Sequence, residues 1–127
     1  MMEGWLKDYY RDVDALALDA FMEHHAEDCV VQFANNPPAK GKAEIRQNME
    51  GFWAMIKGMR HEPVNVWFVD DGATAVLEAI VHYTTHEDEE VSMPVTSLLH
   101  RTNDKVDSLR AYVDLSPLFA KLTPGNA

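Results

Sequence analysis

The stretch from His61 to Asp114 constrains the fold most, because it has the pattern of four successive β-strands. Its segment Thr74–Thr85 contains no glycine or proline and is rich in Val, Ile, Thr and Tyr, which suit a pleated, packed surface. Further apolar runs lie on both sides of it. We therefore expect strands at Val64–Val69, Thr74–Thr85, Val91–His100 and Lys105–Val113.

Three polar segments separate these runs and predict tight turns. Asp70-Asp71-Gly72 follows the first run, and Asp-Gly between apolar runs is a strong hairpin signal. His86–Glu90 is entirely polar, and Thr102-Asn103-Asp104 consists of residues that are common in turns. Short connections of this kind join antiparallel neighbours. The four strands should form an antiparallel meander.

Helical spacing dominates the chain before the meander. Apolar residues recur at intervals of three and four in Gly4–Ala17 and again in the longer segment Lys42–Lys57. A short helix is expected at Ala20–Ala26, and a short strand at Cys29–Phe33 follows it. After the meander, a last helical turn is expected at Leu118–Leu122. The sequence predicts an α+β fold in which helices cover one face of a curved antiparallel sheet.

Length and composition are those of one globular domain. The 127 residues suffice to bury about two thirds of the unfolded surface. Hydrophobic residues make up 46% and charged residues 25%, as in ordinary soluble domains. We expect a single domain over residues 1–127, ordered from about residue 3 to 122, with the last five residues disordered.

Charge and cysteine content exclude several classes of partner. A net charge of −10 disfavours nucleic acid and anionic membranes, which select basic surfaces. No apolar run approaches the ~20 residues of a membrane span, and no basic-then-apolar signal opens the chain, so a cytoplasmic location is expected. One cysteine, Cys29, excludes an internal disulfide and a multi-cysteine zinc site. Neither a metal nor a cofactor is expected.

Short motifs in a fixed order carry a family resemblance, and together they span nearly the whole chain. They are Leu18-Asp19-Ala20-Phe21, Ala26-Glu27-Asp28, Asn36-Pro37-Pro38 with Gly41 and Ile45, Val91 with Pro94, and the segment from Arg110 to Pro117. With them the chain resembles the SnoaL-like, or polyketide-cyclase-like, branch of the nuclear transport factor 2-like and ketosteroid isomerase-like superfamily. The resemblance implies a cone-shaped, cystatin-like fold, a mostly apolar pocket and a homodimer formed through the outer sheet face.

The same resemblance implies that the usual family carboxylates are missing. The general-base aspartate of ketosteroid isomerases falls near Phe33, and their second acid falls near Thr96. The charged residues of the epoxide hydrolases of this fold fall near Ala79, Val81 and Ala111. Only the oxyanion-hole tyrosine has a residue of the same kind, Tyr9.

Strand alternation then selects the residues of the pocket wall. If Thr96 faces inward, so does Leu98. The expected ligand-binding residues are Phe33, Trp53, Trp67, Ala79, Val81, Tyr83, Thr96, Leu98 and Ala111. The expected outer, dimer-forming face contains Val76, Ile80, Met93, Val95 and Leu99. A wall of this composition suits a ligand pocket and equally suits a filled core.

Two residues are candidates for catalysis. His61 enters the sheet after the long helix, and histidine is suited to acid/base work near neutral pH. Tyr9 is the candidate oxyanion donor. The alternatives are a His61 that bonds a helix-end carbonyl or lies on the surface, and a buried Tyr9 that is satisfied by a backbone carbonyl.

Two functions from different classes fit these features. One is an isomerase, cyclase or dehydratase that acts by proton transfer on a small carbonyl or hydroxylated compound. The other is a non-catalytic, dimeric module that binds a small apolar or hydroxylated molecule or serves as a scaffold. The missing carboxylates favour the second function, whereas His61 and Tyr9 favour the first.

Overall fold

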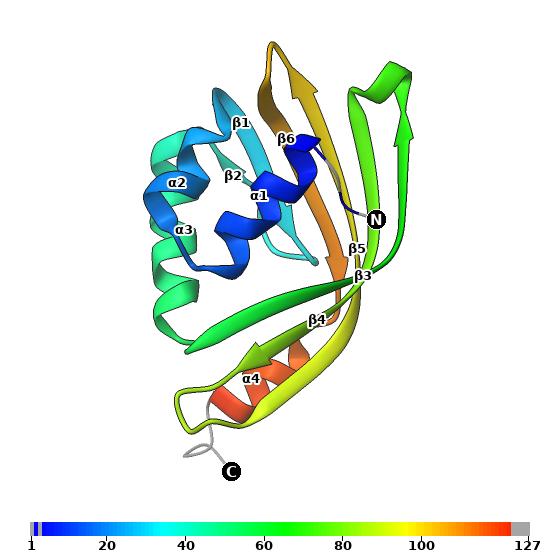
Figure 1. Cartoon of the computed structure of the whole chain (residues 1–127). Coiled ribbons are helices and arrows are strands. Elements are labelled where there is room, and N and C mark those ends of the chain that lie inside the picture. Colours follow the sequence, from blue (N-terminus) through cyan, green and yellow to red (C-terminus); the bar gives the residue numbers. More distant parts are fainter. Residues whose placement is uncertain (1, 3, 123–127) are drawn as a thin grey trace.

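The structure is a computed structural model that describes residues 2 and 4–122. It has an α+β fold, as predicted, with three N-terminal helices and a six-stranded sheet (Figure 1). The expected disorder of the last five residues lies outside the described residues. The helices are α1 (Gly4–Asp14), α2 (Leu18–Glu23), α3 (Lys42–Ala54) and α4 (Ser116–Leu122). The strands are β1 (His25–Phe33), β2 (Ala39–Lys40), β3 (Gly58–Val69), β4 (Thr74–Thr84), β5 (Glu90–Thr102) and β6 (Lys105–Val113), with a 3-10 turn at Asp70–Gly72 between β3 and β4.

The sheet is mixed rather than wholly antiparallel. Its strand order is β2-β1-β6-β5-β4-β3, so the predicted meander β3–β6 is present and β1 is added beside its last strand. The β1–β6 pairing is parallel. Figure 1 shows the long strands bending around α1, α2 and α3, with α4 at one end of the sheet. Buried apolar side chains from all four helices and from the concave sheet face form one core.

Strand β3 begins earlier than expected, and this places His61 inside the sheet. Pairing with β4 starts at Gly58, and His61 lies opposite Val81. The sequence hides this start because Pro63 interrupts the run. Proline is tolerated here because β3 is an edge strand, which need not donate every backbone hydrogen bond.

The predicted facing of β4 is correct, whereas that of β5 is wrong by one residue. Leu77 pairs with Ser97, so Ser97 faces the interior and is only 3% exposed, while Thr96 and Leu98 lie on the outer face. Met93, Val95 and Leu99 are therefore buried core residues and not part of the outer face. Apolar residues occupy both alternating positions of β5, so sequence alternation alone gave no unique register.

Helix α1 ends at Asp14, three residues before the predicted end. The backbone of Leu16 adopts a left-handed φ of 53°, and its N–H donates to Val13 O. The left-handed residue stops the helix in the way that C-terminal caps do. Asp14 thus becomes the last helical residue.

Candidate functional site

The candidate site is built around a pairing between the end of α1 and the middle of β3. Nδ1 of His61 lies 2.7 Å from Oδ1 of Asp14, and the backbone N–H of His61 donates to Oδ2 of the same carboxylate at 3.0 Å. The side chains are 9% and 25% exposed respectively. A carboxylate at a helix C-terminus is disfavoured by the helix dipole. The two hydrogen bonds from His61 offset that cost.

The pairing defines what each nitrogen of a neutral His61 does. Nδ1 carries the proton and donates it to the carboxylate, so Nε2 presents a lone pair. One hydrogen bond to Asp14 comes from the backbone of His61 and the other from its ring, and together they fix the orientation of the ring. An imidazole that is oriented by a carboxylate in this way is equipped to act as a general base.

Two buried tyrosines lie next to the pair. The ring of Tyr10 meets that of His61 edge-on, with 4.7 Å between centroids. Burial raises the pKa of Tyr10 strongly, and a hydrogen bond with Ser97 lowers it by less. Burial, followed by the charge of Asp14, likewise raises the pKa of Tyr83. Both phenols therefore stay protonated at neutral pH and can donate hydrogen bonds.

Tyr10, His61 and Tyr83 line a small inner cavity of about 40 Å³ between the helices and the concave face of the sheet. That volume holds a few water molecules and is far below the ~300 Å³ of a typical ligand pocket. Its walls are Tyr9, Tyr10, Val13, Phe21, Phe33, Met49, Phe52, Trp53, Met59, His61, Val81, Tyr83, Val95, Ser97, Leu109, Ala111 and Val113.

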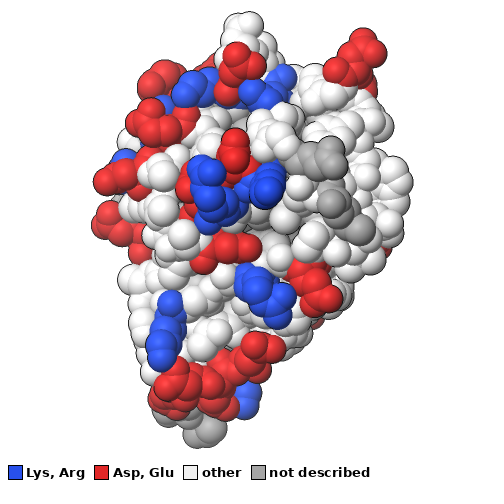
Figure 2. All heavy atoms as spheres, in the orientation of Figure 1, with Lys and Arg blue, Asp and Glu red and all other residues white. Residues whose placement is uncertain are grey.

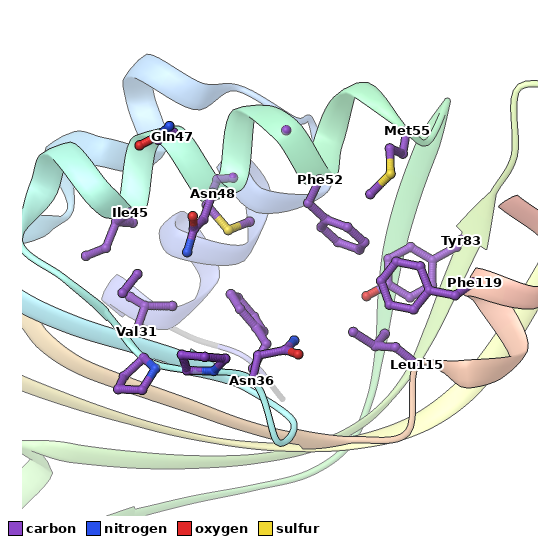
Figure 3. A pocket seen from close by; sticks show the side chains of 16 residues that line it. Val31, Asn36, Ile45, Gln47, Asn48, Phe52, Met55, Tyr83, Leu115 and Phe119 are labelled. Carbon is purple, nitrogen blue, oxygen red and sulfur yellow. The ribbon is translucent and has the colours of Figure 1, made fainter. Parts of the chain in front are cut away.

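A much larger groove of about 720 Å³ lies beside α3. Helix α3, the loop between β1 and β2 and helix α4 form its walls, and Figure 3 shows the rings of Phe52, Tyr83 and Phe119 together at one end. No Asp, Glu, Lys or Arg is among its described lining residues, whose polar side chains are the Asn36, Gln47 and Asn48 amides and the Tyr83 hydroxyl. Its volume lies in the range of ligand pockets.

One cluster of surface charge lies at an end of the molecule. Figure 2 shows acidic side chains gathered at the end of the molecule where Figure 1 places the β4–β5 hairpin. Lys57 pairs there with Asp88, and Lys121 pairs with Glu89 at 3.1 Å. In the described part of the chain, no three His, Cys, Asp or Glu side chains are grouped closely enough to hold a metal ion. The helices described are all too short or too polar to cross a membrane.

The sequence profile of the SnoaL-like domain matches residues 6–109. The chain belongs to the SnoaL-like family. Among curated proteins, none matches the sequence.

Solved structures place this SnoaL-like chain in the nuclear transport factor 2-like fold. A protein with a ketosteroid isomerase-like fold from Catenulispora acidiphila, solved with trimethylamine, has a TM-score of 0.81 at 16% identity, and the match covers 94% of this chain and 92% of that protein. A candidate polyketide cyclase from Xanthomonas campestris has a TM-score of 0.80 at 17% identity, covering 92% and 93%. An epoxide hydrolase from M. tuberculosis has a TM-score of 0.74 at 13% identity, covering 94% and 83%. At these identities the likeness establishes the fold alone.

Seven of the residues predicted for the SnoaL-like site line the inner cavity. They are His61, Tyr9, Phe33, Trp53, Val81, Tyr83 and Ala111. Ala79 faces inward but is packed in the core and lines neither space. Trp67 pairs with Val76 on the outer face and is 49% exposed, so it belongs with Thr96 and Leu98 outside the cone.

Tyr9 is oriented differently from the expectation for an oxyanion donor. Its hydroxyl lies 3.0 Å from Nε2 of the buried His25, whose Nδ1 donates to the carbonyl of Phe21 at 2.9 Å. Burial lowers the pKa of His25 to about 4, so the ring is neutral and its Nε2 accepts the Tyr9 proton. The donor of Tyr9 is thus already used, although by a histidine and not by a backbone carbonyl.

Asp14, Tyr10, Ser97 and Phe52 were not among the predicted site residues. Asp14 carried one usable signal, because an acidic residue four positions after a buried aromatic and at a helix C-terminus requires a compensating partner. Ser97 was missed through the one-residue register error in β5. The groove was missed because most of its lining residues belong to α3, a loop and the segment around α4, which strand alternation does not describe.

Proposed function

We propose that this SnoaL-like domain is an enzyme that catalyses proton transfer on a small uncharged carbonyl or hydroxylated compound, as an isomerase, cyclase or dehydratase. The observation that carries the proposal is the Asp14–His61 pair, whose histidine lines the inner cavity. The trimethylamine complex of the Catenulispora acidiphila protein supports the view that this fold accommodates a small organic molecule.

The residues have distinct roles in the proposed reaction. Nε2 of His61 takes a proton from the carbon next to a carbonyl group, and the C–H electron pair forms a C=C bond while the carbonyl π pair moves onto oxygen. The hydroxyls of Tyr10 and Tyr83 donate to that oxyanion, and Asp14 stabilises the imidazolium. The imidazolium then returns the proton to another carbon in an isomerisation, or to a hydroxyl that leaves as water in a dehydration.

A test that needs no natural substrate uses the base-promoted elimination of 5-nitrobenzisoxazole. The base takes the C3 proton, the N–O bond breaks, and the coloured 2-cyano-4-nitrophenolate is released. The rate should fall about 100-fold or more in His61→Ala protein, which is the usual range for a general base.

His100 provides the matched control, because its Nδ1 also lies 2.7 Å from a carboxylate, that of Asp107, but it is not among the described walls of the cavity. His100→Ala should leave the rate unchanged. A His61→Ala rate equal to that of the wild-type protein, or a wild-type rate no higher than that of free imidazole, contradicts the proposal.

The second candidate is a non-catalytic, dimeric ligand-binding or scaffold protein. The observation that favours it is the 40 Å³ volume of the inner cavity, which leaves no space for a ligand beside His61 unless side chains move. It is distinguished by ligand binding in the groove without any turnover that depends on His61.

A further inference from the structure

The inner cavity and the outer groove are neighbours that share one wall. Phe33, Met49, Phe52 and Tyr83 line both spaces. The ring of Phe52 packs edge-on against Tyr83, with 5.8 Å between centroids, and lies 6.3 Å from the ring of Phe119. These four residues lie between the two spaces, and their side chains would have to move to join them.

The polarity of the two spaces selects an uncharged occupant. In the groove, Asn48 extends from α3 toward the loop that carries Asn36, and both amides can donate and accept (Figure 3). In the inner cavity, the one described lining side chain that can carry charge near neutral pH is His61, which is already paired with Asp14. A buried ligand charge would have no opposite charge to pair with, and burying it would be very costly.

Trp53 supplies an unused hydrogen-bond donor. Its side chain lines the inner cavity and is only 6% exposed. Among the described residues, its Nε1 is the one buried side-chain nitrogen or oxygen atom without a hydrogen-bond partner. Such orphaned donors are rare in folded proteins, and each one calls for an explanation.

The other polar groups of the cavity differ from Trp53 in their hydrogen bonding. The Tyr9 hydroxyl donates its hydrogen bond to His25, and neutral His61 offers a lone pair at Nε2. Tyr10, Tyr83 and Ser97 carry hydroxyls, which either donate or accept, whereas an indole N–H only donates. Trp53 therefore requires an acceptor atom.

We propose that the groove and the inner cavity are two halves of one site for an elongated, uncharged molecule, whose inner end carries a carbonyl or ether-type acceptor for the indole N–H of Trp53. The apolar body of this molecule lies between α3, the β1–β2 loop and α4. The inference rests on the proposed function because it uses the same cavity, but it concerns binding alone.

Calorimetry with probes of one shape tests the proposal. 2-Acetylnaphthalene has the acceptor, and 2-isopropenylnaphthalene replaces it by a methylene group. We expect the ketone to bind roughly tenfold more tightly, as one hydrogen bond allows. In Trp53→Phe protein the two affinities should become equal through weaker binding of the ketone alone. Trp67→Phe, on the outer face, should change neither affinity.

Charged probes of similar size test the second half of the proposal. 2-Naphthoate and 2-naphthylmethylammonium should each bind at least about 100-fold more weakly than the ketone, since a buried charge finds no partner. Using both signs separates burial from the protein's net negative charge. Tight binding of either ion overturns the uncharged class.

A further variant tests whether the groove holds the body of the ligand. Gly51 lines the groove, and a Cβ atom placed on it meets nothing within 4 Å. Gly51→Phe should therefore keep the fold but weaken both neutral probes about tenfold or more. Unchanged binding overturns the two-part site.

Two other outcomes can be told apart from an incorrect binding proposal: a Trp53→Phe protein that does not fold, and a protein without elimination activity. If Trp53→Phe does not fold, Trp53 can be replaced biosynthetically by β-(3-benzothienyl)alanine in a Trp5→Phe, Trp67→Phe background, which keeps the ring shape and removes the N–H. His61→Gln protein should still discriminate ketone from alkene, even if no elimination activity exists. Equal affinity of the two probes for the wild-type protein overturns the Trp53 role.

Discussion

Tyr9 and Tyr10 are adjacent residues with different hydrogen-bond partners, and the difference decides which of them can act on a ligand. Tyr9 is fully buried and donates to His25, whereas Tyr10 packs against the ring of His61. The first contact fixes α1 to the start of β1. The second places a phenol beside the candidate base.

Removing the Tyr9 hydroxyl should therefore destabilise the fold. Tyr9→Phe leaves the buried Nε2 of His25 without a donor, which costs about 1–3 kcal/mol of unfolding free energy. Urea denaturation measures this loss. Tyr112→Phe is the control, because Tyr112 is half exposed on β6. A Tyr9→Phe protein as stable as the wild type would contradict the structural role.

His25 should also make the stability depend on pH. Burial lowers its folded-state pKa from 6.5 to about 4, so the unfolded chain binds more protons between these values. The stability that neutral, buried His25 contributes is fully present above about pH 6.5 and is lost as the pH falls toward 4. The expected loss is about 2 kcal/mol between pH 7.5 and 5.0.

Denaturation of the wild-type and His25→Gln proteins at these two pH values isolates the contribution of His25 to the unfolding free energy, because the other titrating groups are common to both. The variant should lose about 2 kcal/mol less than the wild type over this range. Equal losses in the two proteins would refute the assignment.

At the scale of the element, α3 contributes both to the hydrophobic core and to the wall of the groove. It places Ile45, Met49 and Trp53 in the core, and it also forms a wall of the groove, which Ile45 and Met49 line together with Asn48 and Gly51. Gly51 lies on the groove side, where glycine weakens the helix but leaves the groove open.

Gly51→Ala should stabilise the protein by about 0.5–1 kcal/mol, because a methyl group meets no neighbour and helical alanine loses less conformational freedom on folding. The midpoint of thermal unfolding should rise by a few degrees for a domain of this size. The matched substitution Gly41→Ala should destabilise instead, since Gly41 has a φ of 84°. A lower midpoint for Gly51→Ala would show that the helix face is not open.

At the scale of the whole molecule, we propose that the outer face of the sheet forms the expected homodimer. Trp67, Val76 and Leu98 form one row across β3, β4 and β5, with Ile80 and Pro94 beside them. Arg110 lies over the ring of Tyr112 at the border of this patch. Its mixture of apolar and polar groups is that of many protein interfaces.

We expect light scattering on a size-exclusion peak to give twice the monomer mass of 14.4 kDa. The double variant Trp67→Glu, Leu98→Glu should shift the peak to the monomer, because it places charges in the centre of the patch. Ala43→Glu, exposed on α3, should leave the dimer intact. A wild-type mass near 14.4 kDa would refute the dimer.

Local sequence determined most of the elements of this protein. Residue periodicity and turn chemistry identified the four strands of the meander, α1 and α3, and the inward alternation of β4, because these depend on neighbours in the chain. His61 was found in the same way, since an isolated histidine between a helix and a strand is visible in the sequence.

Tertiary structure alone decided the site. Asp14 meets His61 because Leu16 stops α1 and Pro63 lies on an edge strand, and the two residues are 47 positions apart. The register of β5 brings Ser97 into the cavity, and the packing of α1 against β1 lets the Tyr9 hydroxyl donate a hydrogen bond to His25. Contacts between distant segments depend on the closure of the whole fold, and a pattern of period two or 3.6 carries no information about them.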